Sequence, residues 1–473
     1  MFPAQTSFIP VSVALAKFIA EGGSVWGNYP YWYLGSTPFR YLTGPVVPGI
    51  LVSLSRILPN FSLFDLSLLL VIVSLMIGSI GWGLFSWRLS GHKRLGIYSG
   101  VLSLILPWHL FSSMVLGEVS AILASSLTPF VLLSFVRLAK EEFGIRVLLA
   151  PTLAFSLLLL VNTTASIPAI LGMFLIGLVV FKKPSFGFKR ALVVIIIGWV
   201  LTLWWYGFGF WITVVGAPSV GGKTLIGAFI SLVNSLRTFI PVILAVVFVW
   251  WRVKPKNNFE KFSLFWLAGF VTLSFFRFIS DFRFWMDWTA WMGEVEVGLL
   301  LIIAYLLRNG LNISASKKKL TIIIPILAIF ILGWYLVINK RDFWIPRKSI
   351  GGTVEQKIAT KLATNVYANE TVLLSGTSAF WLNALVDVGQ VRGGRDEVAV
   401  NNDWRKVVWE VRTGDSGEQS VVGLKALGIG YLVVHAKNSK EYYHDIENPA
   451  KFKKIDSVEK IFGDGGDIIY RVR

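Results

Sequence analysis

The sequence has no cysteine and few charged residues. Of its 473 residues, 15% are charged and 55% are hydrophobic, whereas a soluble domain carries about 25% charged residues. Without cysteine the chain forms no disulfide, no thiolate metal site and no cysteine nucleophile. The histidines are scattered along the chain, which argues against a histidine metal site; they are His92, His109, His435 and His444.

Several motifs with known chemistry are also missing. There is no Walker A glycine loop, no HExxH and no GxSxG, so these signatures of phosphate binding, zinc proteolysis and serine hydrolysis do not apply. Residues 1–20 lack the basic region and clean apolar core of a cleavable signal peptide. No fixed repeat of about 20–50 residues is found.

Long apolar runs are what the sequence does have. Runs of about twenty apolar residues recur and predict a polytopic α-helical membrane protein. About ten spans are expected, at 64–88, 95–116, 119–138, 146–162, 165–181, 190–211, 237–252, 261–280, 289–307 and 319–339.

The net charge of +18 is unevenly placed and predicts the orientation. Residues 1–339 hold 25 Lys and Arg against 10 Asp and Glu, and 18 of those 25 lie in alternate loops between spans. Because positively charged loops stay in the cytoplasm, these loops are expected there, and the N-terminal loop and the C-terminal domain are expected outside. The basic excess is read as topology charge, with no nucleic-acid partner.

Three regions follow from this division. Residues 1–63 are expected to form an external aromatic and Pro-rich loop with interfacial helices, because 1–20 look amphipathic and 45–58 are too short to span. Residues 64–339 form the transmembrane part, and one further N-terminal span is expected to be missing. Residues 340–473 are expected to form an external α/β domain with helices near 353–366, 402–412 and 418–427, strands at 371–376 and 430–435, and a hairpin across 463–466.

Candidate site residues gather at the expected external face. The loop 21–48 is too polar to span and too aromatic for an ordinary linker. Glu118 lies in the short turn LGE between two spans, and Asn162-Thr163-Thr164 breaks an apolar stretch at the external end of another. The stretch 280–297 brings four acids, among them Asp287, Glu294 and Glu296, close to Arg283.

Each of these residues also has a structural interpretation. An acid at the start of a helix often caps it or complements its dipole, and aromatic rings often form an interfacial belt. In the functional interpretation Arg283 meets a lipid phosphate, because a guanidinium matches phosphate oxygens. The aromatic loop then stacks on a sugar ring, and a carboxylate acts as a base or metal ligand.

The loop VWGNYPYWYLGSTPFRYLTGPVVPGILVSL resembles the first external loop of GT-C-type membrane glycosyltransferases and their YfhO-like relatives. In those proteins a W-P-Y-x-G-x-P stretch leads to a Pro-started interfacial helix and then to the second span. The LGE turn, the NTT break and Arg283 in FRFW are similar to that pattern. The segments QVRGGRDE, LKALGIGYLVVHAKN and IIYRV resemble the tail of "6-pyruvoyl-tetrahydropterin synthase-related" membrane proteins, whose name does not describe an established activity.

The resemblance implies a polyprenyl-phosphate-linked sugar donor, an external active site and an acid in the first external loop. The corresponding segment here, MFPAQTSFIPVSVALAK, contains no Asp or Glu, which leaves Glu21 and Glu118 as the catalytic candidates. The expected substrate-binding residues are Trp26, Tyr29, Tyr31, Trp32, Tyr33, Arg40, Asn162, Arg283 and Asp287.

The expected partners are the lipid bilayer, the lipid-linked donor and a glycan, lipid or protein acceptor. A divalent cation is kept as a candidate cofactor. The alternative is a non-catalytic envelope protein that binds or translocates a glycolipid or polymer. An ion-coupled transporter is disfavoured, because acids buried in the middle of spans are scarce.

Overall fold

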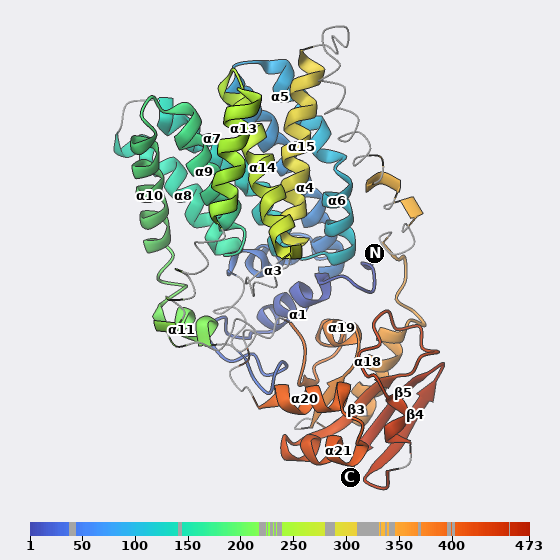
Figure 1. Ribbon diagram of the computed structural model, residues 1–473. Coiled ribbons are helices and arrows are strands. Elements are labelled where there is room, and N and C mark those ends of the chain that lie inside the picture. Colours follow the sequence, from blue (N-terminus) through green and yellow to red (C-terminus); the bar gives the residue numbers. More distant parts are fainter. Residues whose placement is uncertain are drawn as a thin grey trace.

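A bundle of helices stands on a smaller domain that contains a sheet (Figure 1). The computed structural model describes residues 1–36, 44–140, 144–216, 239–279, 289–309, 346–367, 370–394, 403–453 and 455–473, together with a few single positions between them. Arg40, Arg283 and Asp287, which were expected to bind substrate, lie outside the described residues, as does most of the expected span 319–339.

Helices lie at each expected span before residue 310. They are α4 (Leu63–Ser90), α5 (Lys93–Leu104), α6 (Pro107–Phe111), the π-helix η1 (Ser112–Leu116), α7 (Val119–Lys140), α8 (Ile145–Val161), α9 (Ser166–Val180), α10 (Pro184–Val200), α13 (Phe239–Val253), α14 (Asn258–Ile279) and α15 (Thr289–Arg308).

Two expected spans are not continuous helices. The expected span 190–211 ends early, because α10 stops at Val200 and a turn leads to α11 (Phe208–Gly216). The expected span 95–116 is broken before Pro107, whose ring has no N–H to continue the helix. The axes of its two parts differ by 41°.

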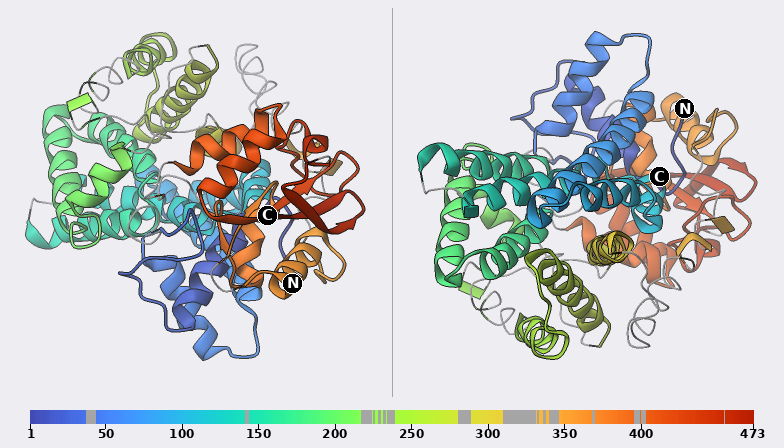
Figure 2. Two further views of the ribbon diagram at one scale, coloured as in Figure 1. Left: turned by 90° about the horizontal axis from the view of Figure 1, so that it is seen from below. Right: turned by 90° about the horizontal axis from the view of Figure 1, so that it is seen from above.

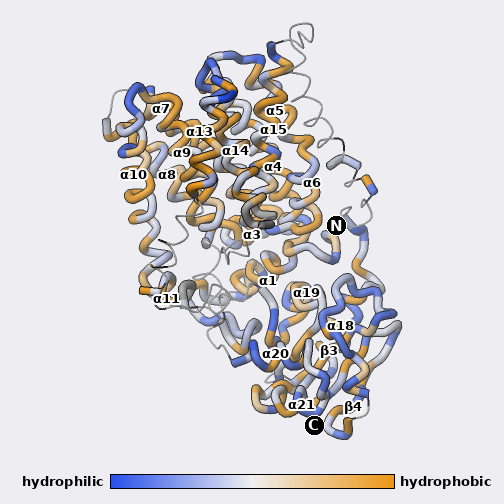
Figure 3. Tube along the Cα trace, viewed as in Figure 1, coloured by the Kyte–Doolittle hydropathy of each residue, from blue (hydrophilic) through white to orange (hydrophobic). Residues whose placement is uncertain are grey.

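Hydropathy separates the bundle from the rest of the chain (Figure 3). Among the described residues, α4 (mean hydropathy 2.4) and α7 (2.0) have the length and apolar character of a membrane span, and the bent pair formed by 93–104 and 107–116 makes a third if it counts as one span. Helix α4 starts cleanly because Ser62 and Asp65 form a reciprocal capping box, and it ends at Gly91 in the left-handed conformation.

The expected cytoplasmic loops meet at one end of the bundle. The Lys140 ammonium donates to the carbonyl of Arg88 (2.8 Å), and Arg190 donates to the carbonyl of Leu138 (2.6 Å). Arg308 lies 2.8 Å from the His92 ring. These contacts join loops that are far apart in the sequence, at the end opposite the C-terminal domain (Figures 1 and 3).

Two short helices, α1 (Ile9–Ala20) and α3 (Val46–Ile57), lie at the other end of the bundle. Each has 12 residues and is therefore about 18 Å long, too short for the roughly 30 Å hydrocarbon core. Their apolar residues share one core cluster with the start of α4; members are Ile9, Val13, Val47, Leu51, Phe64 and Leu66. This agrees with the expectation that neither segment spans.

The C-terminal part forms a five-stranded sheet with helices on both faces. The order along the chain is α18 (Val354–Asn365), β1 (Thr371–Leu374), α19 (Ser378–Leu385), β2 (Gly389–Gln390), α20 (Trp404–Thr413), α21 (Gly417–Ala426), β3 (Ile429–His435), the 3-10 helix η5 (Pro449–Phe452), β4 (Val458–Asp464) and β5 (Asp467–Val472). The strands are ordered β2-β1-β3-β5-β4. Strand β1 is parallel to β2 and β3, whereas β5 is antiparallel to β3 and β4.

Strand alternation explains why both faces are covered. Side chains of successive strand residues point to opposite faces. Val372 and Val433 therefore join the cluster with α18 and α19, whereas Leu373 and Leu432 join the cluster with α20 and α21. The helices and longer strands agree with the sequence expectation, and the two-residue strand β2 was not expected.

The N-terminal loop joins the two parts of the molecule. The Trp32 indole is 2% exposed and donates to the side-chain oxygen of Asn383 (3.0 Å). Its ring lies so close to Gly393 that an added Cβ there would come within 2.1 Å of it. The backbone N–H of Gln390 donates to the carbonyl of Tyr31 (2.9 Å), which extends the sheet edge towards the loop.

In the views along the bundle, the C-terminal domain covers one side of the bundle end only (Figure 2).

We expect Trp32→Ala to lower the free energy of unfolding by about 3–5 kcal/mol, because a fully buried aromatic side chain leaves a cavity. Thermal unfolding of the detergent-solubilised protein measures the loss. Trp26→Ala is the matched control, since Trp26 is in the same loop but 48% exposed, and it should cost much less. Equal losses for the two variants would contradict the role assigned to Trp32.

Candidate active site

Glu118 lies in a fixed turn between η1 and α7. Gly117 adopts a left-handed conformation (φ 57°), which reverses the chain just before Glu118. The N-terminal segment covers this turn, because the Phe8 N–H donates to the carbonyl of Leu116 (2.6 Å) and the Thr6 hydroxyl to that of Val115 (3.0 Å). Glu118 directly precedes the first residue of α7, where the helix dipole favours a negative charge.

Asn162 comes together with Glu118 although 44 residues separate them. It caps the C-terminus of α8, is 3% exposed, and its amide nitrogen lies 3.5 Å from a Glu118 oxygen and 3.3 Å from the Ser120 hydroxyl. Its amide oxygen accepts the Thr164 N–H (2.9 Å), which holds the break between α8 and α9 in place. The NTT break and the LGE turn therefore form one polar cluster at the end of the bundle near α1.

Glu21, the other catalytic candidate, lies elsewhere. It caps the C-terminus of α1, is exposed, and its carboxylate is 4.0 Å from the Lys17 ammonium. Ile9, at the start of α1, packs against Gly117 together with Ser7. The length of α1 thus separates Glu21 from the Glu118 turn by roughly 18 Å, too far for both carboxylates to act on one bond.

Three residues of the aromatic loop are buried in protein. Tyr29, Trp32 and Tyr33 are 1%, 2% and 3% exposed, and the Tyr33 hydroxyl donates to the carbonyl of Gly394. Burial, with smaller effects of Asp387 and neighbouring groups, raises the pKa of Tyr29 well above its ordinary value, so its hydroxyl stays neutral. In this structure these side chains offer no accessible surface to a sugar, and they act as the joint between the bundle and the C-terminal domain.

Two further aromatic residues in the described part of the loop are more accessible. Trp26 is 48% exposed and packs against Trp205, with ring centroids 5.1 Å apart. Tyr31 is half-buried, and its ring lies edge-on to Tyr29 (5.4 Å). These two rings are the members of the expected sugar platform that the structure leaves partly open.

Glu296 lies on α15, and its carboxylate caps the N-terminus of a different helix, α6. Its carboxylate accepts the backbone N–H groups of Trp108 (2.6 Å) and His109 (3.1 Å) at the start of α6, and its Oε2 lies 3.2 Å from the His109 ring. Glu294, which is 8% exposed, has one carboxylate oxygen without a hydrogen-bond partner in the described part of the chain. The sequence signal for the contact between Glu296 and the start of α6 is Pro107, because a proline that begins a new helix leaves N–H groups there that need an acceptor.

The described residues do not provide a metal site. No group of three or more His, Asp or Glu side chains converges in the part of the chain that the structure describes. Among the described residues, Glu118 is the one carboxylate of its cluster, and the Asn162 amide oxygen accepts hydrogen bonds from Thr164.

No protein-family model matches the sequence, and no curated protein matches it. Solved structures do match. The arabinofuranosyltransferase AftD from Mycobacteria has a TM-score of 0.55 at 16% identity, over 99% of this chain and 38% of AftD. The oligosaccharyltransferase of Archaeoglobus fulgidus, in complex with Zn and sulfate, has a TM-score of 0.53 at 14% identity, over 92% of this chain and 64% of that protein.

ArnT from Cupriavidus metallidurans in the apo state matches with a TM-score of 0.51 at 12% identity, over 99% of this chain and 93% of ArnT. The chain spans less than two thirds of the length of AftD and of the oligosaccharyltransferase. At these identities the likeness concerns the fold alone. The chain therefore shares its fold with these three transferases.

The Glu118 turn should be sensitive to one added methyl group. An alanine Cβ at Gly117 would lie 2.1 Å from the Ser7 hydroxyl, in a backbone conformation that alanine disfavours. We expect Gly117→Ala to cost about 2–4 kcal/mol, combining backbone strain with the clash. Gly91→Ala is the control, because Gly91 has a similar φ (77°) but open space around it. Thermal unfolding of both variants compares them, and a smaller loss at Gly117 than at Gly91 would contradict the described packing.

Proposed function

We propose that this protein is a GT-C-type glycosyltransferase that takes a sugar from a polyprenyl-phosphate donor at the external membrane face. The acceptor is a hydroxyl group of a cell-envelope glycan, lipid or protein. The observation that carries the proposal is the meeting of Glu118 and Asn162 at the end of the bundle that bears the C-terminal domain. Within the GT-C fold, the loop and tail motifs support a place near the YfhO-like proteins.

Glu118 is the proposed general base. Its carboxylate accepts the proton of the acceptor hydroxyl while the acceptor oxygen forms the new bond to the sugar C1. The bond between C1 and the donor phosphate breaks, and the polyprenyl phosphate leaves with the bonding electrons. The nearby Asn162 amide, 3.5 Å away, and the fixed Gly117 turn hold the carboxylate in place.

Solved relatives support a lipid phosphate as part of the donor. ArnT has been solved with bound undecaprenyl phosphate (TM-score 0.51) and the Archaeoglobus oligosaccharyltransferase with a tethered acceptor peptide (TM-score 0.52). For this chain, Arg283 and Asp287 remain the predicted donor-binding residues, and Arg40 a further candidate. Trp26 and Tyr31 are the rings proposed to contact the sugar, since they are the more accessible aromatics of the loop.

We expect Glu118→Gln to lower transfer about 100-fold or more, because it removes the proton acceptor and keeps the shape of the side chain. Purified protein incubated with polyprenyl-phosphate sugars and acceptor provides the assay. Glu21→Gln is the matched control and should transfer at the wild-type rate, since Glu21 lies at the far end of α1.

Three results would count against this assignment. Unchanged turnover in Glu118→Gln would remove Glu118 from the chemistry. Loss of turnover in Glu21→Gln alone would favour the other candidate acid. No turnover by the wild-type protein, with a lipid-linked glycan that co-purifies unchanged, would support the non-catalytic binding protein instead.

The proposed orientation is directly testable because the chain has no cysteine. Val422→Cys, at a position that is 68% exposed in the C-terminal domain, should react with a membrane-impermeant maleimide applied to intact cells. Arg94→Cys, at an exposed position in the first turn of α5 and on the expected cytoplasmic side, should react only after the cells are opened. The reverse pattern would place the C-terminal domain and the Glu118 cluster in the cytoplasm.

A further inference from the structure

The C-terminal domain has a topological switch point at β1. The chain leaves β1 through α19 to reach β2 on one side, and then passes through α20 and α21 to reach β3 on the other side. All three strands are parallel, so their carboxyl ends lie at one edge of the sheet. In open α/β sheets with helices on both faces, the crevice at such an edge is where ligands bind.

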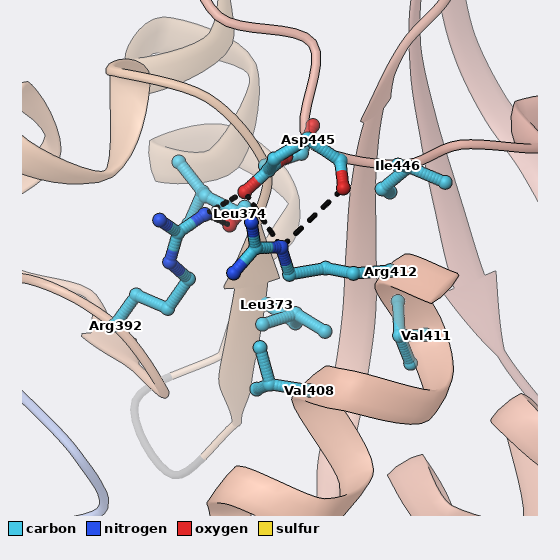
Figure 4. Close-up of a pocket in the computed structure, with 9 residues that line it drawn as sticks. Leu373, Leu374, Arg392, Val408, Val411, Arg412, Asp445 and Ile446 are labelled. Carbon is cyan, nitrogen blue, oxygen red and sulfur yellow. Dashed lines mark hydrogen bonds and ion pairs between the residues drawn. The ribbon is translucent and has the colours of Figure 1, made fainter. Parts of the chain in front are cut away.

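A pocket lies at this edge (Figure 4). Its cavity volume is about 10 Å³, roughly the room that one water-sized atom needs, so it suits a single ligand oxygen, with the remainder of the ligand outside the cavity. Its apolar lining comes from Leu373, Leu374, Val408, Val411 and Ile446.

The polar lining is mainly cationic. The Asp445 side chain is fully buried, and its carboxylate pairs with Arg392 and accepts the Gly376 N–H (3.0 Å). The Arg412 Nε lies 3.6 Å from the same carboxylate. Two guanidinium groups thus face one carboxylate, so the residues that line the pocket keep one net positive charge.

Ser375 provides an independent sign of a ligand. It follows β1 directly, lines the pocket and is 3% exposed, yet its hydroxyl has no hydrogen-bond partner in the described part of the chain. A buried hydroxyl is normally hydrogen-bonded, because leaving it unpaired costs free energy. An acceptor atom inside the pocket would satisfy it.

We propose that this pocket binds an oxyanion, namely the carboxylate or phosphate group of a ligand. When the ligand is absent, the Asp445 carboxylate is the anion that pairs with the two guanidinium groups. The guanidinium groups of Arg392 and Arg412 supply charge-assisted donors, which match the geometry of both oxyanions. The Ser375 hydroxyl supplies a further donor. This site belongs to the C-terminal domain and does not depend on the proposed transfer reaction at Glu118.

Titration calorimetry on the full chain in detergent tests the proposal. The probes are inorganic phosphate and glucuronate, with glucose as the uncharged control and constant ionic strength kept with sodium chloride. We expect phosphate or glucuronate to bind and glucose not to bind. The anion that binds more tightly shows whether the pocket prefers a phosphate or a carboxylate group.

Two variants should shift the affinity in opposite directions. Asp445→Asn removes the competing charge but keeps an oxygen for the Gly376 N–H, so binding should tighten about fivefold or more. Ser375→Ala removes one donor, so binding should weaken about fivefold, while thermal stability without ligand stays equal or rises. Arg471→Gln, on β5 with its guanidinium 3.9 Å from Glu370, is the control and should leave binding unchanged.

A gain of affinity in Asp445→Asn cannot arise from misfolding, so this variant keeps the test decisive. Binding that is the same in wild type, Asp445→Asn and Ser375→Ala would mean an adventitious ion only and would overturn the proposal. Absence of phosphate and glucuronate binding, or equal binding of glucose, would overturn it as well.

Discussion

The burial of Trp32 against the C-terminal domain is the contact on which the arrangement of the molecule depends. The indole bonds to Asn383, and Asn383 in turn accepts a hydrogen bond from Gln390 (2.6 Å), the last residue of β2. A second tie is the ion pair between Lys17 on α1 and Asp387 (2.9 Å). Because α1 also covers the Glu118 turn, the same short N-terminal stretch fixes both the domain position and the candidate active site.

Local patterns predicted the elements well, and contacts distant in the sequence were where prediction failed. The apolar runs predicted the bundle and β3, and the glycine-rich turn at 463–466 predicted the last hairpin, because these signals lie within one segment. The aromatic loop carries the same residues whether it faces solvent or protein. The residues that the loop contacts, Asn383 and Gly393, come some 350 residues later in the chain. No pattern within the loop predicts these contacts. The two residues of β2 are likewise too short to show any period.

The candidate site shows the same division. That Glu118 and Asn162 are special was predicted from the turn and from the break in an apolar stretch, since each interrupts its own segment. That they share one cluster depends on how α7 and α8 pack, which sequence periodicity does not encode. In the structural interpretation, Glu296 was an acid that caps the start of its own helix or complements its dipole. It caps α6 instead, because Pro107 breaks that span and leaves backbone N–H groups that need an acceptor within the bundle.

The distribution of charge connects these features. The basic loops converge at one end of the bundle, through contacts such as Lys140 with Arg88 and Arg308 with His92. The Glu118 cluster lies at the other end, together with the sheet domain and its cationic pocket. In the proposed function, Glu118 is the acid at the transfer point, and the two guanidinium groups of the proposed oxyanion site belong to the C-terminal domain. The two sites differ in the chemistry that they offer, a carboxylate at the end of the bundle and two guanidinium groups in the C-terminal domain.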